Sequence, residues 1–220
     1  MAEEPESISL NSFLPVKQLG KGSFGEVFLV QKKSNKKHYA LKMLSKDKIF
    51  GQNLLVYAYA ERNVQAIVCH PFIVKMHCAF QTSKKLFLVM DYCPAGDLGT
   101  ILQREHKFTK DRAKAYLCEI LLALQELHNH EIIYRDLKPD NIVMDADGHA
   151  LLTDFGLSKQ GIRDRDNTKS FCGSVAYLAP EVLCKAGHGR SVDWYLLGTL
   201  LYEMLVGVPP YFHRNKYIFR

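Results

Sequence analysis

The chain has 220 residues, of which 47% are apolar, and a formal net charge of +6 at neutral pH. A chain of this length and apolar content can bury a substantial core, which argues against intrinsic disorder and allows one domain or two lobes. The lysines nearest Ser34 and Asn35 cluster at a predicted strand-to-strand turn, and no long basic block is interleaved with aromatic residues. The charge therefore predicts no nucleic-acid partner.

The six cysteines show no CxxC spacing, and residues 1–6 contain neither a basic nor an apolar segment of a secretory signal. The sequence therefore predicts a reducing, intracellular compartment: the cytoplasm, with the nucleus as a second location. Cysteine and histidine pairs stand at both ends of residues 69–78, but their spacing fits no usual zinc pattern. The apolar run between them is typical of chain that enters a buried strand, so no metal is expected there.

The first third of the chain predicts a small antiparallel sheet that carries one helix. Strands are expected at residues 13–19, 26–31, 37–44, 73–80 and 86–92, where β-branched and aromatic residues are frequent. The helix is expected over residues 53–68. A linker-like stretch follows at residues 93–96 and separates this region from a helical one.

Helical periodicity dominates the second part. From Thr109, a predicted N-cap, apolar residues recur to Leu127 at the spacing of an amphipathic helix. Residues 141–144 and 149–153 predict a hairpin around an Asp-Gly turn. Residues 192–206 are apolar on nearly all sides and predict a buried helix rather than a membrane span, which would not readily accommodate Asp193 and Glu203.

The most informative stretch is residues 134–141, which read Tyr-Arg-Asp-Leu-Lys-Pro-Asp-Asn, followed by an Asp-Phe-Gly triplet at Asp154. Transfer of the terminal phosphoryl group of ATP needs a carboxylate that accepts the proton of the acceptor hydroxyl, and oxygen ligands for Mg²⁺. Asp136, Asn141 and Asp154 supply these groups, and the predicted hairpin brings the last two together. Each alone would be an ordinary turn residue, but the full set in this order predicts a phosphoryl-transfer site.

Gly20, Gly22 and Gly25 form a GxGxxG pattern followed by Val27. Glycine lets backbone approach phosphate oxygens without a Cβ clash, and valine can cover adenine. The same pattern occurs in dinucleotide-binding folds, but there it opens a helix, whereas here a strand follows. The pattern therefore favours a phosphate-covering loop between two strands.

Lys42 lies in an otherwise apolar strand, where a buried ammonium group needs a partner. The acidic residue well inside the following helix is Glu61, and this pair is the one that a kinase site uses beside the ATP phosphates. The alternative is a lysine that reaches solvent at a sheet edge.

The chain from Gly20 to Phe212 resembles the AGC group of eukaryotic serine/threonine kinases, the relatives of cAMP-dependent kinase, protein kinase B and the ribosomal-protein kinases. The resemblance lies in Tyr-Arg-Asp in place of His-Arg-Asp, His-Pro-Phe-Ile-Val at residues 70–74, Ala-Phe-Gln-Thr at 79–82, and Phe-Cys-Gly at 171–173. It implies an α+β bilobal kinase fold, with an antiparallel β N-lobe and a mostly α C-lobe. The implied domains are an N-terminal extension at 1–12, an N-lobe at 13–92 and a C-lobe at 93–220.

The resemblance also implies roles for single residues. Asp136 would be the base, Lys138 would steady the transferred phosphoryl group, and Asn141 would act with them. Asn141 and Asp154 would bind Mg²⁺, and Met90 would be the gatekeeper before the hinge. The implied ATP-binding residues are Leu19, Gly20, Gly22, Gly25, Val27, Ala40, Lys42, Glu61, Met90, Asp91, Cys93, Asp97 and Val143.

Regulation and substrate choice follow from the same resemblance. Ser170 falls on the activation-loop phosphosite of the family, with Arg135 and Lys159 expected to pair with its phosphate, so an upstream activating kinase is an expected partner. The residues implied to bind the protein substrate are Asp97, Asp140, Ser174 and Glu203. The acidic members of this set predict substrates with arginine upstream of the acceptor Ser or Thr, as in a signalling kinase.

Three departures from the family pattern leave alternatives open. Residues 174–177 read Ser-Val-Ala-Tyr where Thr-Pro-Glu-Tyr is usual, and Gln65 stands where the family stacks an apolar residue. The chain also stops at Arg220, before the end of the family's C-lobe, so Glu181 is expected to lack an arginine partner. One alternative is a pseudokinase that binds nucleotide without turnover. Another is an incomplete product that is marginally stable and exposes part of the 192–206 helix.

Overall fold

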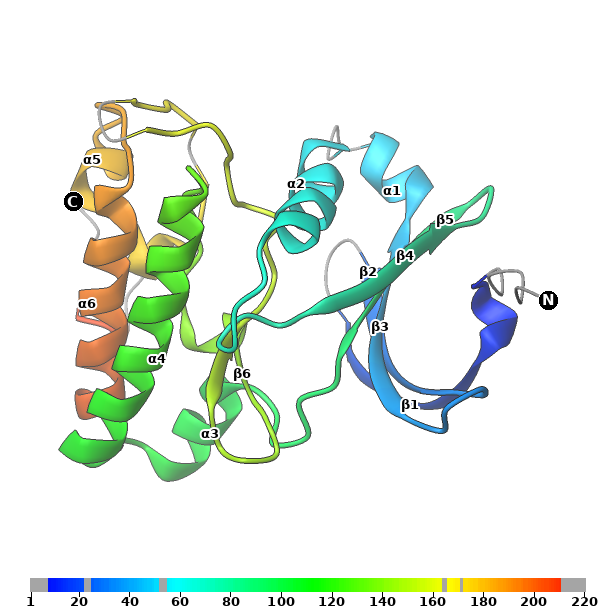
Figure 1. The fold of residues 1–220 in the computed structure, drawn as a ribbon. Helices are drawn as coiled ribbons and strands as arrows, with labels where there is room; N and C mark the ends of the chain where they lie inside the picture. The colour runs from blue at the N-terminus through cyan, green and yellow to red at the C-terminus, as the bar shows by residue number, and fades with distance from the viewer. Residues whose placement is uncertain (1–7, 22–24, 52–54, 164–165, 171, 211–220) are drawn as a thin grey trace.

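The computed structural model describes residues 8–21, 25–51, 55–163, 166–170 and 172–210, which form two lobes (Figure 1). The smaller lobe is a five-stranded antiparallel sheet in the order β1-β2-β3-β5-β4. Its strands are β1 (Phe13–Lys21), β2 (Gly25–Lys32), β3 (His38–Ser45), β4 (Met76–Gln81) and β5 (Lys85–Asp91). The predicted sheet is confirmed, and residues of β1, β2, β3 and β5 line a cleft between the two lobes.

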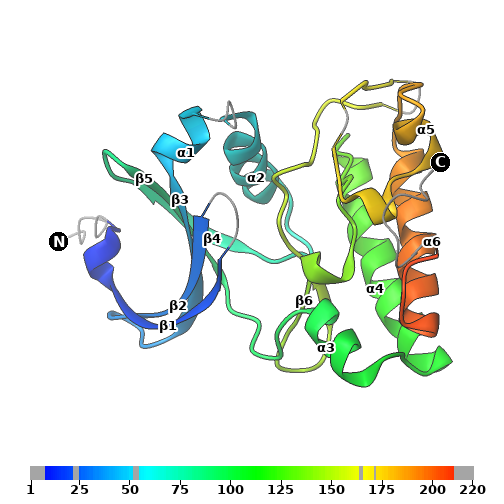
Figure 2. The same cartoon turned by 180° about the vertical axis from the view of Figure 1, so that it is seen from behind.

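Two helices accompany this sheet rather than the one that was predicted. The expected helix is α2 (Leu55–Ile67), and a single short helix, α1 (Lys46–Gly51), precedes it. The α1 segment is too short to show helical periodicity in the sequence, and it forms because Ile49 is buried against the sheet. Both helices lie on the same side of the sheet in Figures 1 and 2.

The strand predicted at 73–80 begins only at Met76. The preceding residues pair with the second lobe instead, because Ile73 forms a parallel bridge with Leu152 and the Val74 amide donates to the Leu152 carbonyl over 2.9 Å. Ile73 and Val74 are almost fully buried there. Their apolar character, which suggested a strand, reflects burial between the two lobes.

The second lobe is mostly helical, with α4 and α6 side by side (Figure 2). Thr109 caps the N-terminus of α4 as predicted, since its hydroxyl accepts from the Arg112 amide. Two short helices had no clear sequence signal, α3 and α5. The elements are α3 (Leu98–Glu105), α4 (Lys110–Asn129), β6 (Ile142–Met144), β7 (Ala150–Leu152), α5 (Pro180–Leu183) and α6 (Ser191–Val206).

The core of this lobe lies between α4, α6 and the β6–β7 hairpin, where Ile120, Leu124, Leu152 and Leu200 are fully buried. Helix α6 ends at Gly207, whose φ is 96°. A Cβ there would stand 2.3 Å from the His106 carbonyl oxygen, so only glycine fits. These contacts hold α4 and α6 together under the β6–β7 hairpin and support the loop that precedes β6.

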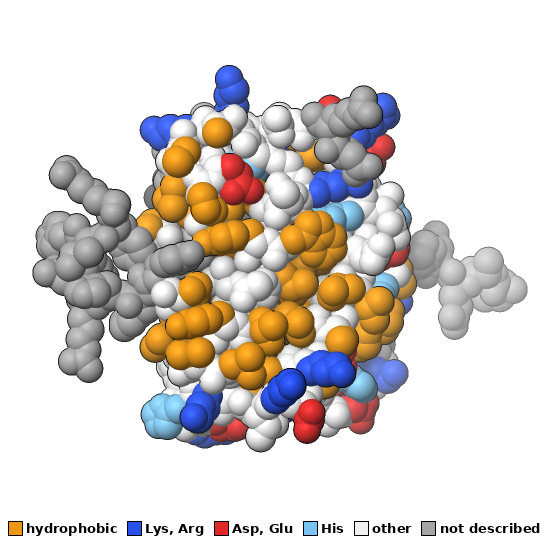
Figure 3. Space-filling model, turned by 90° about the vertical axis from the view of Figure 1, so that its left-hand side faces the viewer, with side chains coloured by type: hydrophobic (Ala, Val, Ile, Leu, Met, Phe, Trp, Pro, Cys, Tyr) orange, Lys and Arg blue, Asp and Glu red, His pale blue; other side chains and the backbone are white. Residues whose placement is uncertain are grey.

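The other side of α6 is exposed. Figure 3 looks onto this side of the molecule and shows apolar side chains spread across it. The exposed apolar residues of the two long helices are Leu121, Leu122, Trp194, Tyr202, Leu205 and Val206. The described part of the chain thus covers only one side of α6, as its nearly uniform apolar composition predicted. No helix among the described residues is long and apolar enough to cross a membrane.

Candidate active site

A cleft of about 1110 Å³ lies between the two lobes, and most of the predicted site residues line it. Ser170 and Glu203 lie outside its wall, and Gly22 lies outside the described residues. The predicted residues that line the cleft are Leu19, Gly20, Gly25, Val27, Ala40, Lys42, Glu61, Met90, Asp91, Cys93, Asp97, Asp136, Lys138, Asp140, Asn141, Val143, Asp154 and Ser174. Residues spread over the whole chain therefore meet in one cavity.

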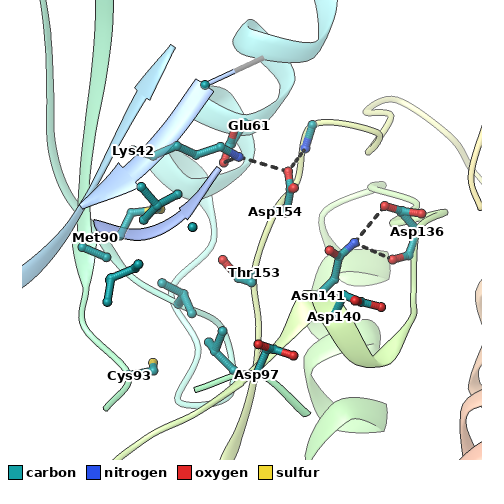
Figure 4. Close-up of a pocket in the computed structure, with 18 of the residues that line it drawn as sticks. Lys42, Glu61, Met90, Cys93, Asp97, Asp136, Asp140, Asn141, Thr153 and Asp154 are labelled. Carbon is teal, nitrogen blue, oxygen red and sulfur yellow. Dashed lines mark hydrogen bonds and ion pairs between the residues drawn. The ribbon is translucent and has the colours of Figure 1, made fainter. Parts of the chain in front are cut away.

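Lys42 joins three elements at the back of the cleft (Figure 4). Its Nζ lies 2.6 Å from Glu61 Oε1 on α2 and 3.2 Å from Asp154 Oδ1, which follows β7. Glu61 is 3% exposed. The predicted pair is present, and the reading of Lys42 as a solvent-directed edge lysine is wrong because its ammonium is enclosed by two carboxylates.

Lys42 and Asp154 both keep their charges at neutral pH. Burial works to lower the pKa of Lys42, but Glu61 and Asp154 outweigh it and hold that pKa above its ordinary value. Burial also works to raise the pKa of Asp154, and the Lys42 ammonium holds it below its ordinary value. Lys42 is therefore a cation and Asp154 an anion, the states that phosphate and metal binding require.

The loop at residues 134–141 is held from below by Asp193 of α6. This carboxylate is fully buried and accepts from the Tyr134 amide over 2.9 Å and from the Arg135 amide over 2.8 Å. His128 of α4 supplies a further contact at 2.8 Å. Arg135 has a φ of 71°, a strained value that these bonds maintain. From the sequence alone Asp193 was assigned no role in the site, although an acidic residue in an apolar helix indicates a buried charge with specific partners.

Asp136 and Asn141 lie together at the floor of the cleft (Figure 4), and Lys138 joins them in a connected polar group. The Asn141 amide nitrogen donates to both the carbonyl and the carboxylate of Asp136, each over 2.8 Å. Lys138 Nζ lies 2.8 Å from the same carboxylate and 3.1 Å from Ser174 Oγ. Asp136 is thus held in place by Asn141 and Lys138, and Lys138 connects it to Ser174.

The β6–β7 hairpin sets the distance between the two predicted metal ligands. Asn141 directly precedes β6, and the Thr153 amide donates to the Asn141 carbonyl over 3.0 Å, which places Asp154 next to it. Because Asn141 uses its amide nitrogen on Asp136, its side-chain oxygen remains as an acceptor. Oxygen donors of this kind suit Mg²⁺ when phosphates complete the coordination, so these residues fit the ion.

Both lobes also contribute apolar side chains to the wall of the cleft. Ala40, Met90 and Val143 line it, and the thiol of Cys93 lies beside the hinge, where burial and then Asp91 raise its pKa to about 12. Gln65 lies behind this wall, with its amide nitrogen 3.2 Å from the Val74 carbonyl. Its amide oxygen is buried without a partner among the described residues. The amide nitrogen of Gln65 is therefore satisfied, whereas its amide oxygen is not satisfied by the described residues.

Gly25 has a structural reason beyond any phosphate contact. A Cβ at this position would lie 2.1 Å from the Met43 carbonyl oxygen on the neighbouring strand. The strand pairing of β2 with β3 therefore demands glycine, whereas Gly20 faces open space within 4 Å. From the sequence alone, close approach to phosphate was the reason expected for both glycines.

Ser170 contacts only one of its two predicted cations. Arg135 Nη1 donates to Ser170 Oγ over 2.6 Å, while Lys159 Nζ donates to the hydroxyl of Thr168 over 2.8 Å. Thr168 was not singled out in the sequence, where threonine in a polar loop carries no distinct signal. It is nevertheless almost fully buried.

The acidic residues expected to bind substrate sit at the cleft's outer edge. Asp140 is exposed, and Glu203 is half-buried with its carboxylate 2.7 Å from the Tyr177 hydroxyl. Asp97 caps α3, since its carboxylate accepts from the Thr100 amide over 2.7 Å. The described residues thus give Asp97 a structural role in addition to any contact with a ligand.

Comparison with known proteins decides the family. The protein kinase domain matches residues 13–219. The chain belongs to the protein kinase domain family. Similar proteins include Protein kinase 2 of Dictyostelium discoideum, 47% identical over 97% of this chain and 44% of the relative, and the Sgk1 serine/threonine kinase of Danio rerio, 49% identical over 91% and 46%.

A RAC family serine/threonine kinase homologue of Dictyostelium discoideum is 44% identical over 97% of this chain and 48% of its own length. These names place the kinase domain in the AGC group, as the motifs indicated. The chain spans about half the length of the curated relatives that it matches. This chain therefore contains a protein kinase domain of the AGC group and of the serine/threonine type.

Proposed function

We propose that the protein transfers the γ-phosphoryl group of Mg²⁺-ATP to serine or threonine in proteins with arginine upstream of the acceptor. The observation that carries the proposal is the position of Lys42, which is paired to Glu61 at 2.6 Å and to Asp154 at 3.2 Å. This arrangement links α2, β3 and Asp154, the second residue after β7, in one group. Kinase catalysis needs these elements together.

The two lobes would contribute different groups to the proposed reaction. Lys42 would bind the phosphates, and Mg²⁺ held by Asn141 and Asp154 would neutralise their charge. Asp136 would accept the proton of the substrate hydroxyl, while Lys138, which contacts both Asp136 and Ser174, would stabilise the moving negative charge. Val27, Ala40 and Met90 would enclose the adenine ring.

The preference for basic substrates is supported by carboxylates at the cleft's outer edge. Asp140 is exposed in the wall of the cleft, and Glu203 is half-buried on α6. Guanidinium groups bind carboxylates in a bidentate manner. Ser170, which is exposed and bonded to Arg135, is the proposed site for an upstream activating kinase. The six free thiols support a reducing compartment, and we propose the cytoplasm.

A pseudokinase that binds nucleotide without turnover is the second candidate. The observation that favours it is the buried amide oxygen of Gln65, which has no hydrogen-bond partner among the described residues and lies one turn after Glu61 on α2. An orphaned oxygen there destabilises the position of α2 that keeps Glu61 on Lys42, by about 1–3 kcal/mol. Turnover separates the two candidates, since nucleotide binding is common to both.

The test is a phosphotransfer assay on the purified chain with Mg²⁺-ATP and two peptides that differ only in an arginine or an alanine upstream of serine. The proposal expects phosphate on the arginine peptide, none with Asp136→Asn, and weak transfer to the alanine peptide. Nucleotide binding by calorimetry without any transfer, before and after phosphorylation of Ser170, would instead establish the second candidate.

A further inference from the structure

Thr168 stands at the centre of a hydroxyl network beside the proposed phosphosite. Lys159 Nζ lies 2.8 Å from Thr168 Oγ1, which lies 3.1 Å from Ser170 Oγ, and Arg135 Nη1 reaches the same serine oxygen over 2.6 Å. These groups come from three parts of the chain. Both cations therefore have oxygen partners while Ser170 carries no phosphate.

The chemistry of the donors fixes the direction of the two outer bonds. A lysine ammonium and an arginine guanidinium can only donate, so Thr168 accepts from Lys159 and Ser170 accepts from Arg135. Each hydroxyl keeps its own hydrogen, so either can be the donor between Thr168 and Ser170. The network runs from Lys159 through Thr168 and Ser170 to Arg135, and Thr168 is its link to Lys159.

The main chain holds Thr168 in place. Its amide donates to the His188 carbonyl over 2.8 Å and its carbonyl accepts from the His188 amide over 2.9 Å, an antiparallel bridge. Thr168 is 3% exposed. Its hydroxyl is therefore presented from a buried, paired position rather than from a solvent-exposed loop, and no other described hydroxyl contacts both Lys159 and Ser170.

We propose that Thr168 is a positioning residue that keeps the unphosphorylated activation segment in place by joining Lys159 to Ser170. This inference rests on the proposed kinase function and on Ser170 as its phosphosite. A phosphate on Ser170 offers both cations stronger, charged acceptors. Thr168 is then no longer needed as the bridge, so its contribution belongs to the unphosphorylated form.

The test uses the full chain with Thr168→Val, which keeps the shape and removes the hydroxyl, and with Thr168→Ser, which restores the hydroxyl. Thr199→Val is the matched control, because Thr199 is a buried threonine whose hydroxyl donates to the Tyr195 carbonyl within α6. Each protein is prepared dephosphorylated and with phosphoserine at position 170. Hydrogen exchange of residues 166–170 is measured by mass spectrometry, and kcat and KM for ATP are measured with a basic peptide.

In the dephosphorylated form, Thr168→Val should speed exchange in this segment and lower kcat, each by about fivefold or more, because two hydrogen bonds are lost. The phosphorylated form should change by less than about twofold, and Thr168→Ser and Thr199→Val should resemble wild type in both assays. Unchanged exchange in Thr168→Val, or an equal loss in both phosphorylation states, would overturn the inference. Faster exchange in a chain that shows no turnover at all would support the network while rejecting the kinase function.

Discussion

The Tyr177 hydroxyl donates a hydrogen bond to the Glu203 carboxylate over 2.7 Å and ties the segment before α5 to the end of α6. Burial raises the pKa of Glu203, the Tyr177 hydrogen bond opposes that effect, and Asp140 adds to it. Asp140 and Glu203 are both carboxylates in the region expected to bind the protein substrate. Their negative charges would attract an arginine of a substrate.

Replacing Asp140 and Glu203 by Asn and Gln should therefore relax the preference for arginine. The expected change is a rise of about tenfold or more in KM for the arginine peptide, because a charged hydrogen bond contributes about 1.5–3 kcal/mol. The alanine peptide should be unaffected. Tyr177→Phe is the matched control, since it leaves both charges and should lower the melting temperature while the arginine preference persists. Equal KM ratios in the double variant and wild type would count against the assignment.

Asp136→Asn should lower kcat by about 10²- to 10⁴-fold while the dissociation constant for ATP stays within about twofold. Asparagine keeps the size of the side chain and can still accept from Asn141, but it cannot take the proton of the acceptor hydroxyl. Binding by calorimetry and turnover by a coupled assay measure the two effects separately. A variant with wild-type kcat would show that another group is the base.

Lys42→Met should raise KM for ATP and lower kcat, with an expected loss of at least about 10²-fold in kcat/KM from removal of the cation beside the phosphates. It also leaves Glu61 buried without its partner, so the melting temperature should fall. The double variant Lys42→Met with Glu61→Gln removes the unpaired charge and should recover stability but not activity. Lys37→Met, at an exposed turn, is the control for lysine loss. Recovery of activity in the double variant would contradict the role of Lys42.

The strands and long helices could be predicted because each shows a consistent pattern over enough residues: β-branched and aromatic content for the strands, amphipathic spacing for α4 and nearly uniform apolar composition for α6. Residues 73–74 show the limit, since they are apolar like a strand but pair with Leu152 in the other lobe. The short helices α1, α3 and α5 were missed because one or two turns contain too few residues for a pattern. Tertiary contacts decide such segments, and a single sequence does not contain them.

The residues of the cleft could be predicted because a phosphoryl-transfer motif is recognised by residue type and order, and most of the predicted residues do line the cleft, while their catalytic roles stay predictions. The supporting residues were not predicted, and Asp193 and Thr168 are the main examples. Asp193 acts through main-chain contacts with residues far away in sequence, and Thr168 acts through hydroxyl contacts with Lys159 and Ser170. Lys159 contacts Thr168 while Ser170 carries no phosphate, and its expected contact with a phosphate on Ser170 stays a prediction.

The last prediction concerns pH and His188, which is 4% exposed and pairs with Thr168 through the main chain. Burial and then the nearby Arg135 and Lys159 cations lower the pKa of His188, with Glu181 and Asp193 acting in the opposite direction. The folded chain therefore binds this proton less readily than the unfolded chain, whose histidine titrates near the ordinary value of about 6.5. Stability should consequently fall as the pH drops below about 6.5, until the folded pKa is passed.

The free energy of unfolding in urea at pH 7.5 and at pH 5.5 tests this expectation. Replacement of His188 by Asn removes the titrating group, so the loss of stability between the two pH values should be smaller than in wild type. His149→Asn gives a control of opposite sign. Glu119 raises the pKa of His149, so this histidine stabilises the fold below about pH 6.5 and loses that contribution as the pH rises. A His188→Asn chain with an undiminished acid-induced loss of stability would show that His188 is not the group responsible.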